Sequence, residues 1–280
     1  MKILITGANG QLGKHLLSTL EHSHTVIGLG RNELDILNKE KVNTVISTLK
    51  PEIIIHSAAF TAVDQCELDP KKAFEINGLG TGYVAQAASN INARMFYISS
   101  DYVFDGKKNS PYNEDDEPNP ISAYGMSKWL GEKLVQKFNN GTIIRTSWLY
   151  GHDGGNFVKT MIKLGQENKE LKVVDDQIGS PTYVNDLADV IIRLFYKESK
   201  IYHVSNTDAC TWYEFARTIF EEKGYNPELI IPTTTLEYGA LAPRPSYSIL
   251  GHEAILEENI DLPRPWKEAL KDFLRKEREL

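Results

Sequence analysis

The chain begins with Met1-Lys2-Ile3-Leu4-Ile5-Thr6, followed directly by Gly7-Ala8-Asn9-Gly10-Gln11-Leu12-Gly13. The first run is short and apolar, as is typical of a strand buried in a parallel sheet. Residues 14–21 have the pattern of a helix, so a glycine-rich turn joins a strand to a helix. Such a turn lets a pyrophosphate approach the free N–H groups of a helix N-terminus. The spacing is G-x-x-G-x-x-G, and a plain connecting loop is the alternative; the position directly after a strand favours dinucleotide binding.

We expect the turn and the end of the next strand to bind the dinucleotide. The turn residues in this prediction are Gly7, Asn9, Gly10, Gln11, Leu12 and Gly13. Residues 25–28 predict a second strand, and no carboxylate follows it to bind a ribose 2′-hydroxyl. Arg31 could instead pair with a 2′-phosphate, which favours NADPH and leaves NADH possible; an ordinary surface charge is the alternative. Asp35 and Ile36 could line the adenine pocket, although Asp35 could equally cap a helix.

Strand and helix patterns alternate through the first half of the chain. Apolar strands are expected over 53–55, 95–98 and 142–145, and helices over 39–50, 70–89 and 122–138. This order predicts an α/β fold with a Rossmann-type, doubly wound parallel sheet. Ligands of such sheets bind beyond the carboxyl ends of the strands. We therefore expect Ala58, Ala59, Thr61 and Ser99 to line the cofactor site.

The second half of the chain is less regular. Residues 1–150 are predicted to form the dinucleotide-binding domain, and a helix and strand from about 183–205 return to it. A loop is expected over 175–182. We expect residues 151–182 and 206–280 to form a smaller, discontinuous substrate-binding lobe that closes over the cofactor.

Tyr124 and Lys128 carry the chemistry that we expect. They are four residues apart on a predicted helix and therefore share one face. A nearby ammonium lowers the pKa of a phenol, and the same lysine can hydrogen-bond a nicotinamide ribose. Ser100, after the fourth strand, can hold a carbonyl oxygen beside the tyrosine. Tyr-x-x-x-Lys alone is common by chance, but after a glycine turn and a serine-bearing strand it predicts a proton relay for hydride transfer.

This order of motifs resembles the extended short-chain dehydrogenase/reductase superfamily, whose catalytic roles carry over to Ser100, Tyr124 and Lys128. Further motifs resemble the dTDP-4-dehydrorhamnose reductase family within it. They are Ala-Ala-Phe-Thr-Ala-Val-Asp (58–64), Ser-Ser-Asp-Tyr-Val-Phe-Asp-Gly (99–106), Arg-Thr-Ser-Trp-Leu-Tyr-Gly (145–151), Gly-Ser-Pro-Thr (179–182) and Ala-Pro-Arg-Pro (242–245), with a late Trp266. The resemblance spans nearly the whole chain.

The resemblance implies NADPH-dependent reduction of the C4 ketone of dTDP-4-dehydro-L-rhamnose to dTDP-L-rhamnose. The residues then expected to bind the nucleotide-sugar substrate are Ser100, Asp101, Trp148, Asn156 and Arg244. Trp148 could pack on a sugar or base or be a core aromatic. Arg244 could meet a diphosphate or be a surface charge.

Two departures from the family pattern bear on the chemistry. In the family that this chain resembles, some members form a magnesium-bridged dimer and have a glutamate just after the glycine turn. His15 stands at that place here, so we expect no metal. Serine replaces the more frequent threonine at Ser100, a change that keeps the hydroxyl.

The sequence is also compatible with other functions. Another sugar-nucleotide reductase, an epimerase or a 4,6-dehydratase is possible, although dehydratases resemble one another in having Asp-Glu where this chain has Asp101-Tyr102. A non-catalytic, cofactor-binding regulatory subunit, similar to that of methionine adenosyltransferase, is the alternative from another class.

Composition excludes several partners. The net charge of −7 gives no electrostatic footprint for nucleic acid or an acidic membrane. No apolar run approaches the ~20 residues of a membrane span, and we expect no signal peptide because the chain opens with a strand. Cys66 and Cys210 cannot build a disulfide framework, which favours the cytoplasm. We expect a monomer or a weak homodimer.

Overall fold

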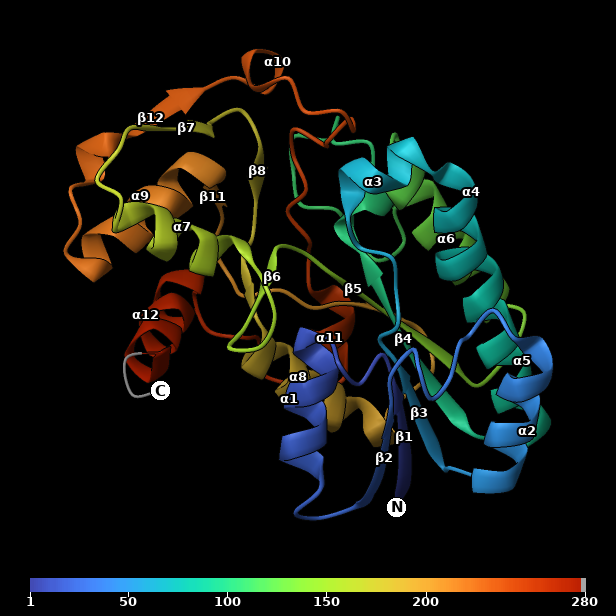
Figure 1. Ribbon diagram of the computed structural model, residues 1–280. Coiled ribbons are helices and arrows are strands. Elements are labelled where there is room, and N and C mark those ends of the chain that lie inside the picture. Colours follow the sequence, from blue (N-terminus) through green and yellow to red (C-terminus); the bar gives the residue numbers. More distant parts are fainter. Residues whose placement is uncertain (278–280) are drawn as a thin grey trace.

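The computed structural model describes residues 1–277 and is built around a six-stranded parallel sheet (Figure 1). The strand order is β10-β5-β4-β3-β1-β2. In chain order the strands are β1 (Lys2–Thr6), β2 (Thr25–Leu29), β3 (Ile53–His56), β4 (Arg94–Ser100), β5 (Gly141–Thr146) and β10 (Ile201–His203). Because β1 lies between β2 and β3, the sheet has its topological switch at β1 and β3. The predicted doubly wound α/β fold is confirmed.

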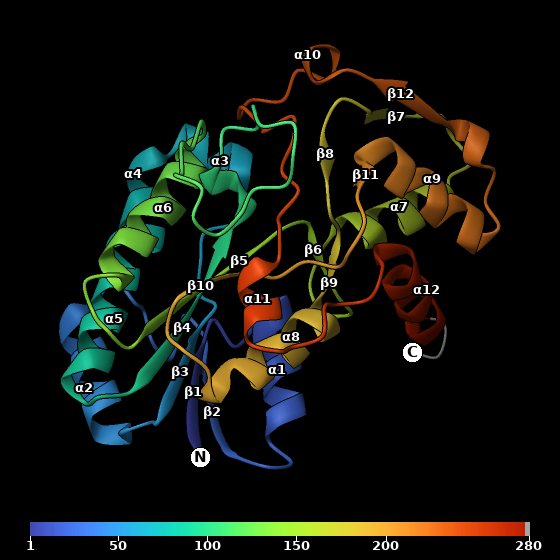
Figure 2. The ribbon, with the colours of Figure 1, turned by 180° about the vertical axis from the view of Figure 1, so that it is seen from behind.

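Helices cover both faces of the sheet (Figures 1 and 2). On one face lie α1 (Gln11–Leu20) and α8 (Val184–Arg193); on the other lie α2 (Lys39–Leu49), α5 (Thr81–Asn90) and α6 (Ala123–Val135). Within β1, Ile3 and Ile5 join the core under α1 and α8, whereas Leu4 joins the core under α2 and α5. Both faces of β1 are therefore buried, which explains its unbroken apolar sequence.

The segment predicted as one helix over 70–89 has three parts, and this prediction is wrong in its middle. A π-helix, η1 (Phe74–Gly80), separates α4 (Pro70–Ala73) from α5. The wider turn carries Asn77, whose side chain accepts from the Phe60 N–H at 2.7 Å and donates to Ser127 Oγ at 2.9 Å. Asn77 thus connects the loop after β3 to α6, in keeping with the frequent occurrence of π-helical turns at functional sites.

A second group of elements lies beside the sheet domain (Figure 1). Its paired strands are β7 (Leu171–Val174) with β12 (Ile230–Thr233), β8 (Ile178–Gly179) with β11 (Cys210–Thr211), and β6 (Leu149–Tyr150) with β9 (Thr182–Tyr183). The expected loop over 175–182 is therefore wrong in part. This second group also contains α7 (Phe157–Gly165), α9 (Trp212–Lys223), η4 (Pro227–Leu229), α10 (Thr235–Tyr238) and α12 (Trp266–Glu277). Packed on the elements of the sheet domain are α3 (Val63–Leu68), η2 (Asp101–Val103), η3 (Leu194–Tyr196) and α11 (Glu253–Glu257). Within residues 1–277, no helix has the length and apolarity that crossing a membrane demands.

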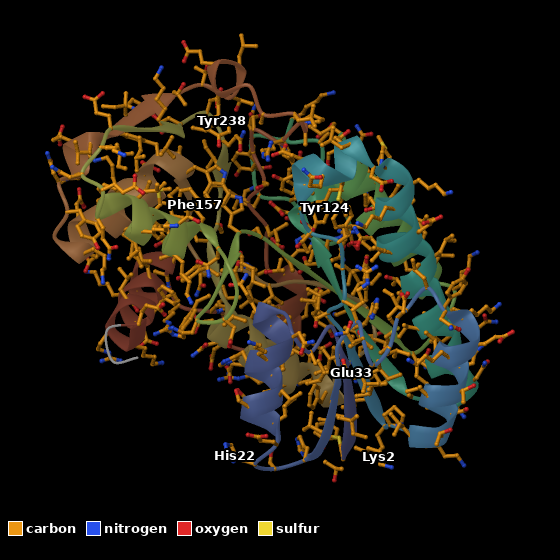
Figure 3. The ribbon with its side chains drawn as sticks, in the orientation of Figure 1. Lys2, His22, Glu33, Tyr124, Phe157 and Tyr238 are labelled. Carbon is orange, nitrogen blue, oxygen red and sulfur yellow. The ribbon has the colours of Figure 1, made fainter. Side chains whose placement is uncertain are left out.

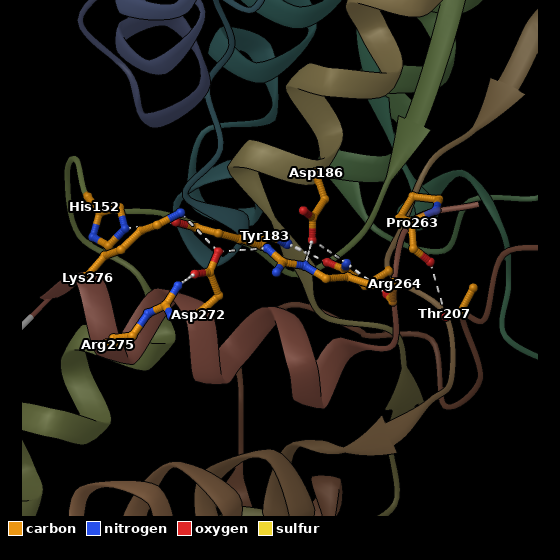
Figure 4. Close-up of polar contacts among 10 residues, drawn as sticks. His152, Tyr183, Asp186, Thr207, Pro263, Arg264, Asp272, Arg275 and Lys276 are labelled. Atoms are coloured by element: carbon orange, nitrogen blue, oxygen red, sulfur yellow. Dashed lines mark hydrogen bonds and ion pairs between the residues drawn. The ribbon is translucent and has the colours of Figure 1, made fainter. Parts of the chain in front are cut away.

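Charged contacts connect the last helix to the sheet domain (Figure 4). Arg264 Nε donates to Asp186 Oδ2 of α8 at 3.1 Å, and Arg264 Nη2 donates to Asp272 Oδ2 of α12 at 3.0 Å. Asn206 also donates to Asp186 Oδ2, at 2.6 Å. These contacts fix α12 against α8, although the two helices are far apart in the sequence.

Gly131 of α6 faces the point where β4 and η1 meet. A Cβ at this position would lie 2.4 Å from Tyr97 Oη and 2.5 Å from the Asn77 carbonyl oxygen. Because a backbone oxygen cannot move aside like the end of a side chain, we expect Gly131→Ala to lower the free energy of unfolding by about 1–3 kcal/mol. Urea denaturation measures this effect. Gly155→Ala is the control, since a Cβ there meets no described atom within 4 Å; equal midpoints for both variants would contradict the packing argument.

Candidate active site

Two joined cavities lie beyond the carboxyl ends of β1, β3 and β4. One, of about 410 Å³, is here named the Tyr124 cavity, and the other, of about 380 Å³, the Arg31 cavity. Both are lined by Gly10, Ser57 and Ala59, so they form one trough along the glycine turn. Figure 3 labels Tyr124 on the side of the sheet domain, and Phe157 and Tyr238 on the second group of elements.

Most residues predicted from the sequence line these two cavities. The Tyr124 cavity contains Gly10, Gln11, Leu12, Gly13, Ala59, Thr61, Ser99, Ser100, Asp101, Tyr124, Lys128 and Trp148. The Arg31 cavity contains Gly7, Asn9, Gly10, Arg31, Asp35, Ile36, Ala58 and Ala59. A larger cavity, of about 780 Å³ at the amino ends of β5 and β10, contains none of the predicted residues.

Two predicted substrate residues lie elsewhere. Arg244 lines a further cavity of about 360 Å³, here named the Tyr238 cavity, and its Nη2 donates to Asp64 Oδ2 at 3.0 Å. Asn156 lines none of the three cavities named here. Its side chain caps α7 by accepting from the Lys159 N–H, and it donates to Gln11 Oε1 at 2.9 Å. Asn156 therefore reaches the trough through Gln11.

Packing within the chain accounts for two of the three turn glycines. Gly7 has a φ of 70°, and a Cβ there would lie 2.6 Å from the Ala58 nitrogen. A Cβ on Gly13 would lie 2.4 Å from the Gly7 carbonyl oxygen. Gly10 is the N-cap of α1, which has neither a side-chain cap nor an acidic residue in its first turn. The N–H groups at this helix end are thus left for an anion in the trough.

The start of α6 brings the candidate catalytic groups together. Ser122 caps the helix, accepting from the Gly125 N–H at 3.1 Å. Tyr124 and Lys128 share a helix face, and the Tyr124 phenol is within hydrogen-bonding reach of Ser100. Lys128 Nζ donates to the Ile98 carbonyl oxygen at 2.6 Å. Ser100, Tyr124 and Lys128 therefore face one cavity, which is an arrangement able to bind and protonate a carbonyl oxygen.

Burial changes the pKa of Tyr124 in the direction opposite to the one expected from the sequence. The pKa of Tyr124 is raised, because desolvation of the phenolate outweighs the opposing effect of its hydrogen bond with Ser100. The prediction of a lowered pKa is therefore wrong for this structure. Burial also lowers the pKa of Lys128 to about 7, and the negative charge of Glu132 opposes that change. Tyr124 is consequently a proton donor at neutral pH.

Asp101 lies beside the same hydroxyl. Ser100 Oγ donates to Asp101 Oδ1 at 2.9 Å, and the Tyr102 N–H donates to Ser100 Oγ at 3.2 Å. Burial raises the pKa of Asp101 to about 6, although hydrogen bonds from Ser248 and Ser100 oppose this effect. Ser100 is thus held in place by its own neighbours before any substrate binds.

Two tryptophans form a wall of the Tyr124 cavity. Trp148 has a φ of 47°, a left-handed conformation that is costly for a side chain of this size. Its ring stacks on Trp212 of α9, with centroids 3.6 Å apart and planes 11° from parallel. Strain next to a cavity is characteristic of functional sites. Trp212 and Tyr102 were missed from the sequence, since no local pattern singles them out.

The sequence also missed a carboxylate next to the Arg31 cavity. Glu33 Oε2 accepts a hydrogen bond from the Gly30 N–H at 3.0 Å, so an acidic group does lie at the end of β2. Figure 3 labels this residue. Glu33 is three residues after Gly30. The backbone turns between them, and this turn brings the Glu33 carboxylate back to the Gly30 N–H at the end of β2.

Comparisons with known proteins identify the family of this chain. The family model described as "RmlD substrate binding domain" matches residues 1–279. A spore coat polysaccharide biosynthesis protein, SpsK of Bacillus subtilis (strain 168), is 49% identical, covering 98% of this chain and 97% of that protein. The dTDP-4-dehydrorhamnose reductase of Aggregatibacter actinomycetemcomitans is 41% identical, covering 97% of this chain and 98% of that protein.

A solved structure matches over almost its full length. It is the dTDP-4-dehydrorhamnose reductase of Bacillus anthracis str. Ames in complex with NADP. Its TM-score is 0.95 at 44% identity, with 98% of this chain and 99% of that chain covered. The chain described here therefore belongs to the dTDP-4-dehydrorhamnose reductase family of NAD(P)H-dependent oxidoreductases.

Proposed function

We propose that this protein reduces the C4 ketone of dTDP-4-dehydro-L-rhamnose to give dTDP-L-rhamnose, with NADPH as the reductant. The observation that carries the proposal is that Ser100, Tyr124 and Lys128 line one cavity that continues into the trough along the glycine turn. The names of the relatives support the sugar nucleotide, and the intact set of three side chains supports catalysis over a purely regulatory role.

The trough fits NADPH. The uncapped N-terminus of α1 suits its pyrophosphate, and the exposed Arg31 in the neighbouring cavity suits a 2′-phosphate. Ala58 and Ala59 leave room beside the turn, and Lys128 could hydrogen-bond the nicotinamide ribose. The NADP complex of the Bacillus anthracis relative supports this choice. When bound, NADPH supplies the hydride that C4 accepts.

The protein groups bind the ketone and move one proton. Ser100 Oγ would turn its single proton from Asp101 Oδ1 to the C4 carbonyl oxygen when the substrate binds. Tyr124 gives its phenolic proton to that oxygen as negative charge develops on it. The ammonium of Lys128, one helical turn along α6, would stabilise the phenolate left behind. Tyr124 then regains its proton from solvent.

We propose that residues 151–182 and 206–280 form the lobe that binds the rest of the substrate. Trp212 lines both the Tyr124 cavity and the Tyr238 cavity, so a ligand could extend from one to the other. Arg244 lines the Tyr238 cavity and also contacts the side chain of Tyr102, which lines the Tyr124 cavity. This position suits the binding of a substrate diphosphate that lies between the two cavities. The diphosphate would then compete with Asp64 for Arg244.

We further propose that the protein acts in the cytoplasm as a monomer or weak homodimer. Cys66 and Cys210 are both buried and unpaired, which suits a reducing compartment.

Tyr124→Phe tests the mechanism, because it keeps the ring and its packing but removes the transferable proton. We expect the single-turnover rate of NADPH oxidation with dTDP-4-dehydro-L-rhamnose to fall by about 10²–10⁴-fold, while NADPH binding persists. Tyr225→Phe, which removes a phenol hydroxyl outside the three cavities named here, is the matched control. A rate near that of the parent for Tyr124→Phe would contradict the mechanism and favour the regulatory-subunit hypothesis.

Arg31→Ala tests the cofactor. If Arg31 pairs with the 2′-phosphate, the variant should lose affinity for NADPH by about 1–2 kcal/mol, roughly 5–30-fold, and bind NADH as the parent does. Fluorescence titration with each cofactor measures both affinities. Arg275→Ala, which changes an exposed arginine of α12, is the control. Equal losses for NADPH and NADH would show that Arg31 does not distinguish them.

Chelation tests the expectation that no metal is needed. His15, not a carboxylate, follows the glycine turn, and among residues 1–277 no group of three His, Cys, Asp or Glu side chains is placed to hold a metal. We expect turnover to survive prolonged dialysis against EDTA. Activity that disappears on dialysis and returns with Mg²⁺ would overturn this expectation.

A further inference from the structure

A buried ion pair lies one helical turn beyond Lys128. Tyr124, Lys128 and Glu132 follow one another at four-residue intervals on α6. Glu132 and Arg145 of β5 are each only 1% exposed. Arg145 Nε donates to Glu132 Oε1 at 3.0 Å, and Arg145 Nη2 donates to Oε2 at 2.8 Å. Ser99 Oγ adds a third hydrogen bond, to Oε1 at 2.6 Å. Three donors therefore point at the two carboxylate oxygens of Glu132.

Lys128 needs a counter-charge because it is almost fully buried. It is 2% exposed, and its Nζ lies 4.3 Å from the centre of the Tyr97 ring of β4. From β3 it faces His56, whose pKa burial lowers to about 3, so that ring is neutral and offers no negative charge. Among residues 1–277, Glu132 is the carboxylate whose charge favours the ammonium form of Lys128.

The titratable side chains that pack against the pair from β10 and β4 are neutral. Arg145 Nη1 lies 3.3 Å from Nε2 of His203 on β10, and burial holds the pKa of His203 well below its usual range. Burial also raises the pKa of Tyr97, and Glu132 adds to that effect, so the phenol keeps its proton. On the loop before α6, Arg145 Nη1 donates to the Glu114 backbone oxygen, and its charge also lowers the pKa of the half-buried Asp116 carboxylate. Arg145 and Ser99, not Lys128, thus occupy the oxygens of Glu132.

We propose that Glu132 and Arg145 are positioning residues for the reduction: Arg145 holds Glu132 behind Lys128, and the carboxylate keeps Lys128 charged beside Tyr124. The inference rests on the proposed function, because it concerns the same lysine and tyrosine. Without Glu132, the pKa of Lys128 would fall below about 7, and the lysine would be mostly neutral at neutral pH and could no longer stabilise the Tyr124 phenolate. Arg145 contributes by fixing the carboxylate on the side of Lys128 away from the cavity.

The pH profile of Glu132→Gln tests the proposal. A reaction that needs charged Lys128 slows as the pH rises through the pKa of that group, while buried Tyr124 keeps its proton to higher pH. An opposite charge nearby typically raises the pKa of a lysine by about 1–3 units. We therefore expect the alkaline limb of kcat/KM to move at least about one pH unit downward in Glu132→Gln. An unmoved limb, or a parent enzyme without an alkaline limb, overturns the proposal.

Two further variants separate this role from a structural one. Glu114→Gln is the matched control, since it makes the same chemical change on the other side of Arg145; its alkaline limb should coincide with that of the parent. Glu132→Gln leaves Arg145 buried without a partner and could unfold the protein. Glu132→Gln/Arg145→Gln removes both charges, and its limb should still lie below that of the parent. A double variant with the parental profile would show that the pair only stabilises the fold.

The pH dependence of NADPH binding separates this proposal from the proposed function. Fluorescence titration of NADPH across the same pH range needs no sugar nucleotide and reports on Lys128 at the ribose. If the parent binds NADPH with an alkaline limb that Glu132→Gln moves downward, but reduces no sugar nucleotide, the proposed function fails and this inference stands. If the parent reduces the sugar and the variant shows unmoved limbs in both measurements, this inference alone fails.

Discussion

The close packing of α6 against β4 and η1 is the constraint on which the rest of the site depends. Gly131 allows the approach, because any side chain there would meet Tyr97 and the backbone of Asn77. The same approach lets Asn77 donate to Ser127 on α6 while it accepts from the loop after β3. As a result, the Asn77 side chain connects the helix that carries Tyr124 to the loop that lines the trough.

Burial then determines the chemistry of the groups on α6. Desolvation raises the pKa of Tyr124 and lowers the pKa of Lys128, so each group moves toward its neutral form. A buried ion pair is weak evidence for stability, because the cost of desolvation can exceed the attraction. The Glu132–Arg145 pair beside Lys128 is therefore better explained by its effect on the protonation state of the lysine than by a contribution to the stability of the core.

The two parts of the trough meet at the topological switch of the sheet. The glycine turn follows β1 and the alanine-rich loop follows β3, and these neighbouring strands deliver both to one edge. Across the cavity, Trp148 leaves the end of β5 in a strained conformation and stacks on Trp212 of α9. The stack joins the sheet domain to the second group of elements, so the wall of the cavity depends on both.

The sequence by itself determined the doubly wound sheet, the glycine turn and the Tyr-x-x-x-Lys pair, because these are local patterns of backbone hydrogen bonding and helical spacing. Tertiary structure decided what lies far apart in the chain or depends on burial. No periodic pattern in the sequence predicts the π-helix, the stacking of Trp212 or the contact of Glu33 with Gly30. The raised pKa of Tyr124 follows from desolvation, which spacing alone does not report. Glu132 likewise meets Arg145 only because β5 lies beside β4 and under α6, where two charges can be buried together.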